Sequence, residues 1–275
     1  MKTNILLAIL AILCVALLSC SKNEQPEEFV PYGPPVYKTS YIEHLTKVSV
    51  IGMQIYADAY FIDEENKIVS FGGYQGDKPV YSDRISLHIG LGAIAGSFEM
   101  YDDCVRDTPN PDERCIERTN KFYEIVREIG DTTFNRKVRY SLEHLGICAI
   151  DKIKSVSVTS DKDFNAEYPA GANLNELFTF YANDAYALIK NNYQQPEDTY
   201  SYGTNKWTAN IPMAIIKKKL STVNFPEHPY LDTRWYCILD EAPQKTDTYT
   251  FYVSVVLEDG TELKAEDSRG IKGLE

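Results

Sequence analysis

The stretch RISLHIGL, residues 84–91, alternates apolar and polar side chains with a period of two. Its apolar members, Ile85, Leu87, Ile89 and Leu91, would all lie on one face of a strand. This pattern is typical of a sheet that packs on a core with one face and meets solvent with the other. Similar runs, mostly separated by turn residues, occupy residues 48–61, 67–71, 138–142, 153–158, 234–239 and 249–257. The sequence therefore predicts a mainly β domain with antiparallel sheets.

The C-terminal part predicts a β-hairpin. Two strand-like runs, residues 249–257 and 261–265, lie on either side of Asp259-Gly260, a pair typical of primed two-residue turns. A two-residue turn would set Leu263 opposite Val256, on the less apolar face of the first strand. The sequence leaves this register open.

One helix is predicted to end before Gly130. The N-cap, first helical residue and capping-box acid would be Asn110, Pro111 and Glu113. Its apolar stripe would consist of Cys115, Phe122, Val126 and Ile129. Residues 174–189 fit a helical face and a strand equally well, so both alternatives stay open. The expected fold is an antiparallel β-sandwich, immunoglobulin-like, with one or two short helices.

The N-terminus has the form of an export signal. Lys2 precedes an unbroken apolar run of 14 residues, from Ile5 to Leu18. A transmembrane helix needs about 20 apolar residues, so this run is too short to span a bilayer. The pattern predicts a secretory signal peptide over residues 1–19.

The four residues Leu17-Leu18-Ser19-Cys20 resemble the lipobox of bacterial lipoproteins, in which a small residue precedes a cysteine that receives lipid. This resemblance makes Ser19 and Cys20 the signal-peptidase site and Cys20 the lipidated first residue of the mature chain. The alternative is an ordinary signal peptide whose Cys20 is incidental. Each methylene of an acyl chain such as palmitate adds roughly 0.8 kcal/mol of membrane affinity, so several chains would anchor the protein durably. Membrane lipid is therefore the first expected partner.

The composition of the chain predicts its domain organisation and excludes one class of partner. Residues 20–36 are acidic and proline-rich, which favours an extended tether, and a globular domain over residues 37–275 follows, as one unit or two sub-domains. The chain has 28 basic and 40 acidic residues and a formal net charge of −12. Nucleic acid is excluded as a partner because its binding depends on clustered Lys and Arg. The longest basic run, Lys217-Lys218-Lys219, is interpreted as a solvated edge or turn.

Four cysteines would remain after cleavage and lipidation: Cys104, Cys115, Cys148 and Cys237. An even set in an exported protein indicates disulfides. Cys104 with Cys115 is the favoured pair because a loop by composition separates them. Cys148 and Cys237 would then pair with each other or stay as buried thiols. The spacing does not support a zinc site.

A calcium site at Asp161, Asp163 and Glu167 is an alternative interpretation of one acidic segment. The segment Asp161-Lys162-Asp163-Phe164-Asn165 opens like an EF-hand loop, but Ala166 stands where the turn needs glycine and Ala172 where the loop needs glutamate. A solvated turn is the preferred interpretation. No metal and no cofactor is predicted.

The densest aromatic region gives the candidate ligand-binding residues, Tyr200, Tyr202, Trp207, Trp235 and Tyr236. Aromatic faces beside planar polar groups suit a sugar or a peptide, although packing of these rings in the core is the favoured alternative. The four histidines occur in no H-E-x-x-H motif, and no G-x-S-x-G motif offers a serine nucleophile. No catalytic residue is predicted.

Three features together resemble an uncharacterised lipoprotein family of gut-type Bacteroidetes. These are the lipobox with its acidic tether, the stretch from Val156 to Gly171, and the closing strand pair YTFYVSVVLEDGTEL. The resemblance implies a β-rich, sandwich-like envelope domain with no established activity, and it carries over no catalytic residues.

The expected function is that of a lipid-anchored envelope protein, held at the outer rather than the inner membrane, which binds a glycan or protein or takes part in assembly. A fimbrial-type structural subunit and an envelope hydrolase are the alternatives. A flat aromatic strip would favour glycan binding, an open groove the subunit, and a nucleophile beside a histidine the hydrolase.

Overall fold

The computed structural model describes residues 36–57, 80–81, 85–92, 99–101, 112–138, 146–197 and 213–275. Every described residue belongs to one compact unit, residues 35–275. Within the described ranges, no helix has the length and apolar character needed to span a membrane.

The larger sheet has five strands in the order β11-β10-β12-β5-β3, and all neighbouring pairs are antiparallel. Its strands are β3 (Val50–Ala57), β5 (Ile85–Gly92), β10 (Phe178–Asn183), β11 (Ile215–Lys219) and β12 (Arg234–Leu239). The strand predicted at residues 84–91 is β5, and its four apolar side chains are buried as the alternation requires. Among the described strands, β11 forms one edge of this sheet, which agrees with the interpretation of Lys217-Lys218-Lys219 as an edge.

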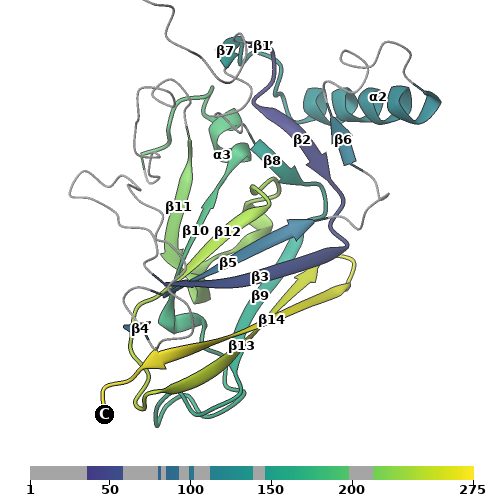
Figure 1. Ribbon diagram of the computed structural model, residues 1–275. Coiled ribbons are helices and arrows are strands. Elements are labelled where there is room, and N and C mark those ends of the chain that lie inside the picture. The colour runs from purple at the N-terminus through teal and green to yellow at the C-terminus, as the bar shows by residue number, and fades with distance from the viewer. Residues whose placement is uncertain are drawn as a thin grey trace, which may run out of the picture. The chain divides into compact units, whose positions relative to one another are not determined.

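The second sheet has the order β4-β14-β13-β9. Its strands are β4 (Val80–Tyr81), β9 (Ile153–Ser160), β13 (Asp247–Leu257) and β14 (Glu262–Lys272). β9, β13 and β14 are antiparallel, whereas β4 pairs in parallel with the end of β14. Figure 1 shows β9, β13 and β14 running alongside one another.

One hydrophobic core joins the two sheets. It includes Leu87, Phe180 and Trp235 from the five-stranded sheet together with Phe251 and Val253 from the four-stranded sheet, all at most 1% exposed. Apolar residues from both sheets meet in a single layer, which is the defining feature of a sandwich. The predicted mainly β fold with antiparallel sheets in a sandwich-like arrangement is confirmed, and the described residues include two α-helices.

The C-terminal hairpin has a three-residue loop. Val256 pairs with Glu262 and Val255 with Leu263, and Gly260 ends the loop with a φ of 89°. Such loops place a glycine in the left-handed region, where it carries no steric cost. The extra loop residue shifts the register by one position and therefore moves Leu263 to the face of buried Val255, where it packs against the core. The register that a two-residue turn would impose is wrong.

A smaller sheet, β6-β2-β8, and both helices surround a second core. The strands are β2 (Ile42–Thr46), β6 (Glu99–Tyr101) and β8 (Gly146–Ala149), with β2 parallel to β8; β1 (Val36–Lys38) and β7 (Arg136–Val138) form a separate pair. The helices are α2 (Glu113–Glu128) and α3 (Ala185–Lys190). Tyr41, Phe122 and Leu188 lie at the centre of this core and are fully buried.

The predicted first helix is found as α2 with a different N-cap. Asp112 caps it, accepting the N–H of Cys115 on Oδ1 at 2.7 Å, and Asn110 lies outside the described residues. Gly130 has a φ of 82° and follows the last turn, as expected for a glycine that ends a helix. The predicted apolar stripe is buried.

The ambiguous segment at residues 174–189 contains both structures. A short 3-10 helix, Asn175–Leu177, leads into β10, and α3 then begins after Asp184. Asp184 accepts the N–H of Ala187 at 3.0 Å and so starts the helix. Two further 3-10 turns cover Leu220–Thr222 and Phe225–Glu227.

The other strand predictions have mixed outcomes. β9, β12 and β13 match the predicted segments within two residues at each end. β3 is shorter than residues 48–61 as far as the described residues extend, and the predicted strand at residues 67–71 lies outside them. β7 covers only the first residue of the predicted strand at residues 138–142, whose remainder also lies outside.

Candidate functional site

Several predicted site residues lie outside the described ranges. They are Ser19 and Cys20 of the lipobox, Cys104, and the aromatic residues Tyr200, Tyr202 and Trp207. Their roles remain predictions.

The described cysteines are divided between the two cores and the helix. Cys148 and Cys237 are free and fully buried, in different cores, so they are the buried thiols of the second alternative and do not pair. Burial raises the pKa of both thiols, and neighbouring carboxylates raise that of Cys148 further. Cys115 is disulfide-bonded at the start of α2. Its predicted pairing with Cys104 stays a prediction.

Trp235 belongs to the core and cannot offer its face to a ligand. Its side chain is 0% exposed, and its indole N–H donates to the carbonyl of Asp232 at 2.7 Å. Its ring lies 5.7 Å from that of Phe180 and 5.8 Å from that of Phe225. Core packing, the alternative favoured for the aromatic region, is therefore the role of this residue.

Tyr236 lies on the opposite face of β12 and is partly buried. Its ring meets the edge of the His88 ring at 4.7 Å. Burial lowers the pKa of His88 from 6.5 to about 4, so this imidazole is neutral at pH 7. Between pH 6.5 and about pH 4 the unfolded chain binds a proton at His88 that the folded protein does not, so the free energy of unfolding decreases as the pH falls through this range. The environment of His88 is therefore that of a histidine packed in the protein interior.

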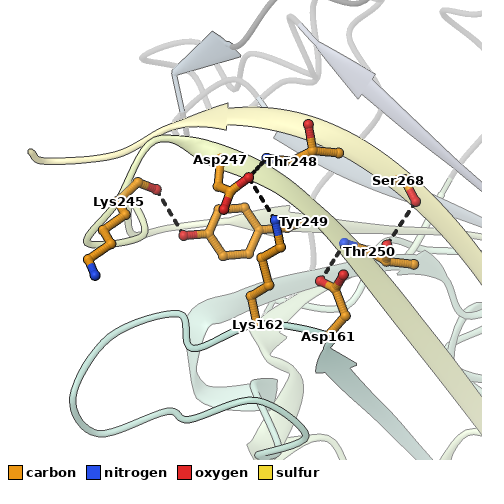
Figure 2. A network of polar contacts seen from close by, with 8 residues as sticks. All are labelled: Asp161, Lys162, Lys245, Asp247, Thr248, Tyr249, Thr250 and Ser268. Carbon is orange, nitrogen blue, oxygen red and sulfur yellow. Dashed lines mark hydrogen bonds and ion pairs between the residues drawn. The ribbon is translucent and has the colours of Figure 1, made fainter.

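The turn after β9 holds the proposed calcium ligands, and two of its carboxylates accept backbone N–H groups. Asp161 accepts the N–H of Thr250 at 2.9 Å (Figure 2). Asp163 accepts the N–H of Ala170 at 2.8 Å. Lys162 pairs with Asp247 at 2.7 Å and so joins the turn to the start of β13. Glu167 is exposed. Across the described residues no group of three or more His, Cys, Asp or Glu side chains could hold a metal. Asp161 and Asp163 therefore stabilise the turn and its junction with β13.

A histidine–carboxylate pair lies beside the second core. Nδ1 of His228 is 2.6 Å from Oδ2 of Asp184, whose Oδ1 caps α3. A hydrolase would need a nucleophile within reach of this imidazole. Among the described residues, no serine hydroxyl or cysteine thiol is hydrogen-bonded to His228. The pair joins the loop before β12 to the start of α3.

A second buried carboxylate, Asp131, joins the end of α2 to the smaller sheet. It is 0% exposed and accepts the N–H groups of Tyr41 and Ile42, both at 2.8 Å, and the hydroxyl of Tyr193 at 2.9 Å. Burial raises the pKa of Asp131, and the three hydrogen bonds act in the opposite direction. Because all three donors bind the Asp131 carboxylate, the role of Asp131 is structural.

The outward side of β9, β13 and β14 forms the candidate binding surface, here called the hairpin face. It consists of Ser157, Thr159, Tyr252, Ser254, Glu262, Lys264 and Glu266. A hollow of about 500 Å³ lies over these residues, which is within the range of small-ligand pockets, about 300–1,000 Å³. The opposite side of the same strands is the core, because apolar and polar side chains alternate along β13.

Cross-strand pairing places Tyr252 in the middle of the hairpin face. It lies between Thr159 of β9 and Glu266 of β14, and the neighbouring row sets Ser254 between Ser157 and Lys264. The small hydroxyl side chains leave the tyrosine ring 40% exposed. An exposed ring among hydroxyl and carboxylate groups can stack on a ligand and hydrogen-bond it at the same time.

A larger hollow of about 890 Å³ lies along α2. It is lined by Glu113, Ile116, Glu117, Asn120, Lys121, Glu124 and Arg127. All of these residues belong to one helix, and within the described ranges no second element encloses the space. A site needs convergent groups from several elements, so the hairpin face is the better candidate.

Sequence reasoning missed Tyr252, although the sequence contains a signal for it. Along residues 249–257 the odd positions are apolar and buried, whereas Thr250, Tyr252 and Ser254 occupy the polar phase. A large aromatic residue on the polar phase of an otherwise regular strand has no core to fill. The local density of aromatic residues instead predicted Trp235 as a ligand-binding residue, but Trp235 packs in the core.

Comparisons with protein-family models, with curated proteins and with solved structures found no match for this chain.

Proposed function

We propose that the chain is a lipid-anchored protein of the bacterial cell envelope that binds a glycan on the hairpin face. The lipobox-like Ser19-Cys20 and the preceding apolar run support the address, with the outer membrane as the expected site. The exposed ring of Tyr252, set between Thr159 and Glu266 over the hollow, is the observation that carries the binding role.

The anchor is tested by replacing the acceptor thiol. Cys20→Ser is expected to release most of the protein from the membrane fraction, because two or three acyl chains provide the membrane affinity and the variant has none. Cell fractionation followed by immunoblotting measures this, and intact mass of the native protein gives the acyl mass. Cys237→Ser, at a buried thiol, is the control and should stay with the membranes. A Cys20→Ser protein that still sediments with membranes would refute the anchor.

The binding role is tested by Tyr252→Ala in the full-length chain kept in mild detergent. We expect glycan affinity on an array to fall about tenfold or more, since truncating a central tyrosine commonly costs over about 1 kcal/mol. Tyr123→Ala is the matched control: it removes an equally exposed tyrosine, 40%, from α2 instead. Equal binding by both variants, or no glycan bound by the unaltered chain, would contradict the proposal. Capture of a protein dependent on Tyr252 would instead indicate a protein ligand.

The described residues bear on each rival function at one place, the β9 edge for the subunit and His228 for the hydrolase. A subunit that assembles by strand addition needs an open strand edge. On the outer side of β9, Asn175 accepts the N–H of Val158 at 2.9 Å and donates to the carbonyl of Val156 at 2.8 Å, so its amide occupies that edge. Leu174 donates to the carbonyl of Val158 at 2.8 Å and extends this cover. The hydrolase reading lacks a nucleophile beside His228 in the described part of the chain.

A further inference from the structure

The charges of the hairpin face restrict which glycans it can accept. Its three ionisable side chains other than tyrosine are Glu262, Lys264 and Glu266, so the face is acidic by one charge. The whole chain has a formal net charge of −12 and adds to the same potential. A negative surface repels negative polymers, and the repulsion is strongest at low ionic strength.

The one cation on the hairpin face is already neutralised. Nζ of Lys264 lies 3.0 Å from Oε2 of Glu262, and Oε1 of the same carboxylate accepts the hydroxyl of Ser254 at 2.6 Å. These two contacts lower the pKa of Glu262, which is therefore ionised at neutral pH. Lys264 thus has a fixed counter-charge and is a poor partner for an incoming carboxylate or sulfate.

Glu266 is in the opposite situation. It is exposed, and no hydrogen bond or ion pair to its carboxylate occurs within the described residues. It lies directly across from Tyr252, with Thr159 on the far side of the ring. A free carboxylate beside an aromatic face accepts hydrogen bonds from adjacent hydroxyl groups of a ring stacked there, and such charge-assisted bonds are about twice as strong as neutral ones.

We infer that the hairpin face selects uncharged glycans, with a sugar ring stacked on Tyr252 and its hydroxyl groups donating to Glu266, and that it rejects anionic glycans. This inference rests on the proposed glycan-binding function and names the ligand class of that site.

The experiment compares uncharged and anionic polysaccharides on the full-length chain in mild detergent. Dextran, laminarin and mannan are the uncharged probes, and polygalacturonate, alginate and heparin are the anionic ones. We expect retention of one or more uncharged probes and of no anionic probe, at both low and physiological salt. Retention of an anionic probe that is lost in Tyr252→Ala would overturn the selectivity but keep the glycan-binding function. Failure to retain any glycan overturns both.

Two charge-removing variants sharpen the test. Glu266→Gln should weaken the retained uncharged glycan about tenfold, because the charge-assisted bonds are lost. Glu262→Gln should release Lys264, and binding of anionic probes should then become measurable. Glu241→Gln removes the same charge from an exposed position after β12 and should change neither. If Glu266→Gln and Glu241→Gln bind alike, the assignment of Glu266 is wrong.

Discussion

Replacing Asp131 with alanine is expected to lower the free energy of unfolding by about 3–5 kcal/mol, because each buried donor left without a partner costs about 1–3 kcal/mol. The carboxylate accepts from two backbone N–H groups, of Tyr41 and Ile42, and from the hydroxyl of Tyr193. No water can replace these bonds cheaply, since Asp131 is 0% exposed. The loss would separate the end of α2 from the smaller sheet.

Urea unfolding of the full-length chain, followed by circular dichroism, measures this difference. Asp112→Ala is the control: it removes one exposed aspartate that accepts a single N–H at the other end of α2, and it should cost about 1 kcal/mol. Asp131→Asn keeps one acceptor oxygen and should fall between the two. If Asp131→Ala were no more destabilising than Asp112→Ala, the buried network would not be the structural tie described above.

Trp235→Ala should also cost about 3–5 kcal/mol, the usual range for truncating a buried tryptophan. The indole packs against both Phe180 and Phe225 in the sandwich core, and its N–H donates to the carbonyl of Asp232. Truncation would leave a cavity where the two sheets meet.

Thermal unfolding gives the cost of Trp235→Ala, and Tyr252→Ala serves as the comparison because its ring is 40% exposed and should change stability by less than about 1 kcal/mol. The conservative variant Trp235→Phe should fold and keep its glycan binding, whereas Tyr252→Ala should fold and lose it. A stable Trp235→Ala protein with weakened ligand binding would reverse the roles given to these two residues.

Local patterns predicted most of the sandwich. The alternation of apolar and polar residues predicted four strands, β5, β9, β12 and β13. A strand that is buried on one face must repeat its apolar residues at every second position. The apolar stripe of α2 predicted the helix, but its N-cap is Asp112 and not the predicted Asn110. Such features depend on neighbours within a few residues along the chain.

Features that depend on more than local pattern were missed or left open. The register of the C-terminal hairpin depends on whether its loop has two or three residues. Gly260 is compatible with both loop lengths because glycine adopts positive φ without steric cost. The segment at residues 174–189 divides into β10 and α3 at Asp184, a residue whose capping role depends on the turn in which it lies. Alternation and periodicity carry no information about either choice.

The sequence by itself determined the strand pattern, the helix α2 and the acidic character of the chain, because each follows from short-range periodicity or from composition. Only the tertiary structure decided that Trp235 is core, that Asp161 accepts a backbone N–H from β13 and Asp163 one from its own turn, and that Tyr252 lies exposed between Thr159 and Glu266. The reason is that exposure and pairing depend on which strands become neighbours. β9 and β14 are about a hundred residues apart along the chain, and their contributions to the hairpin face exist only once β13 has joined them.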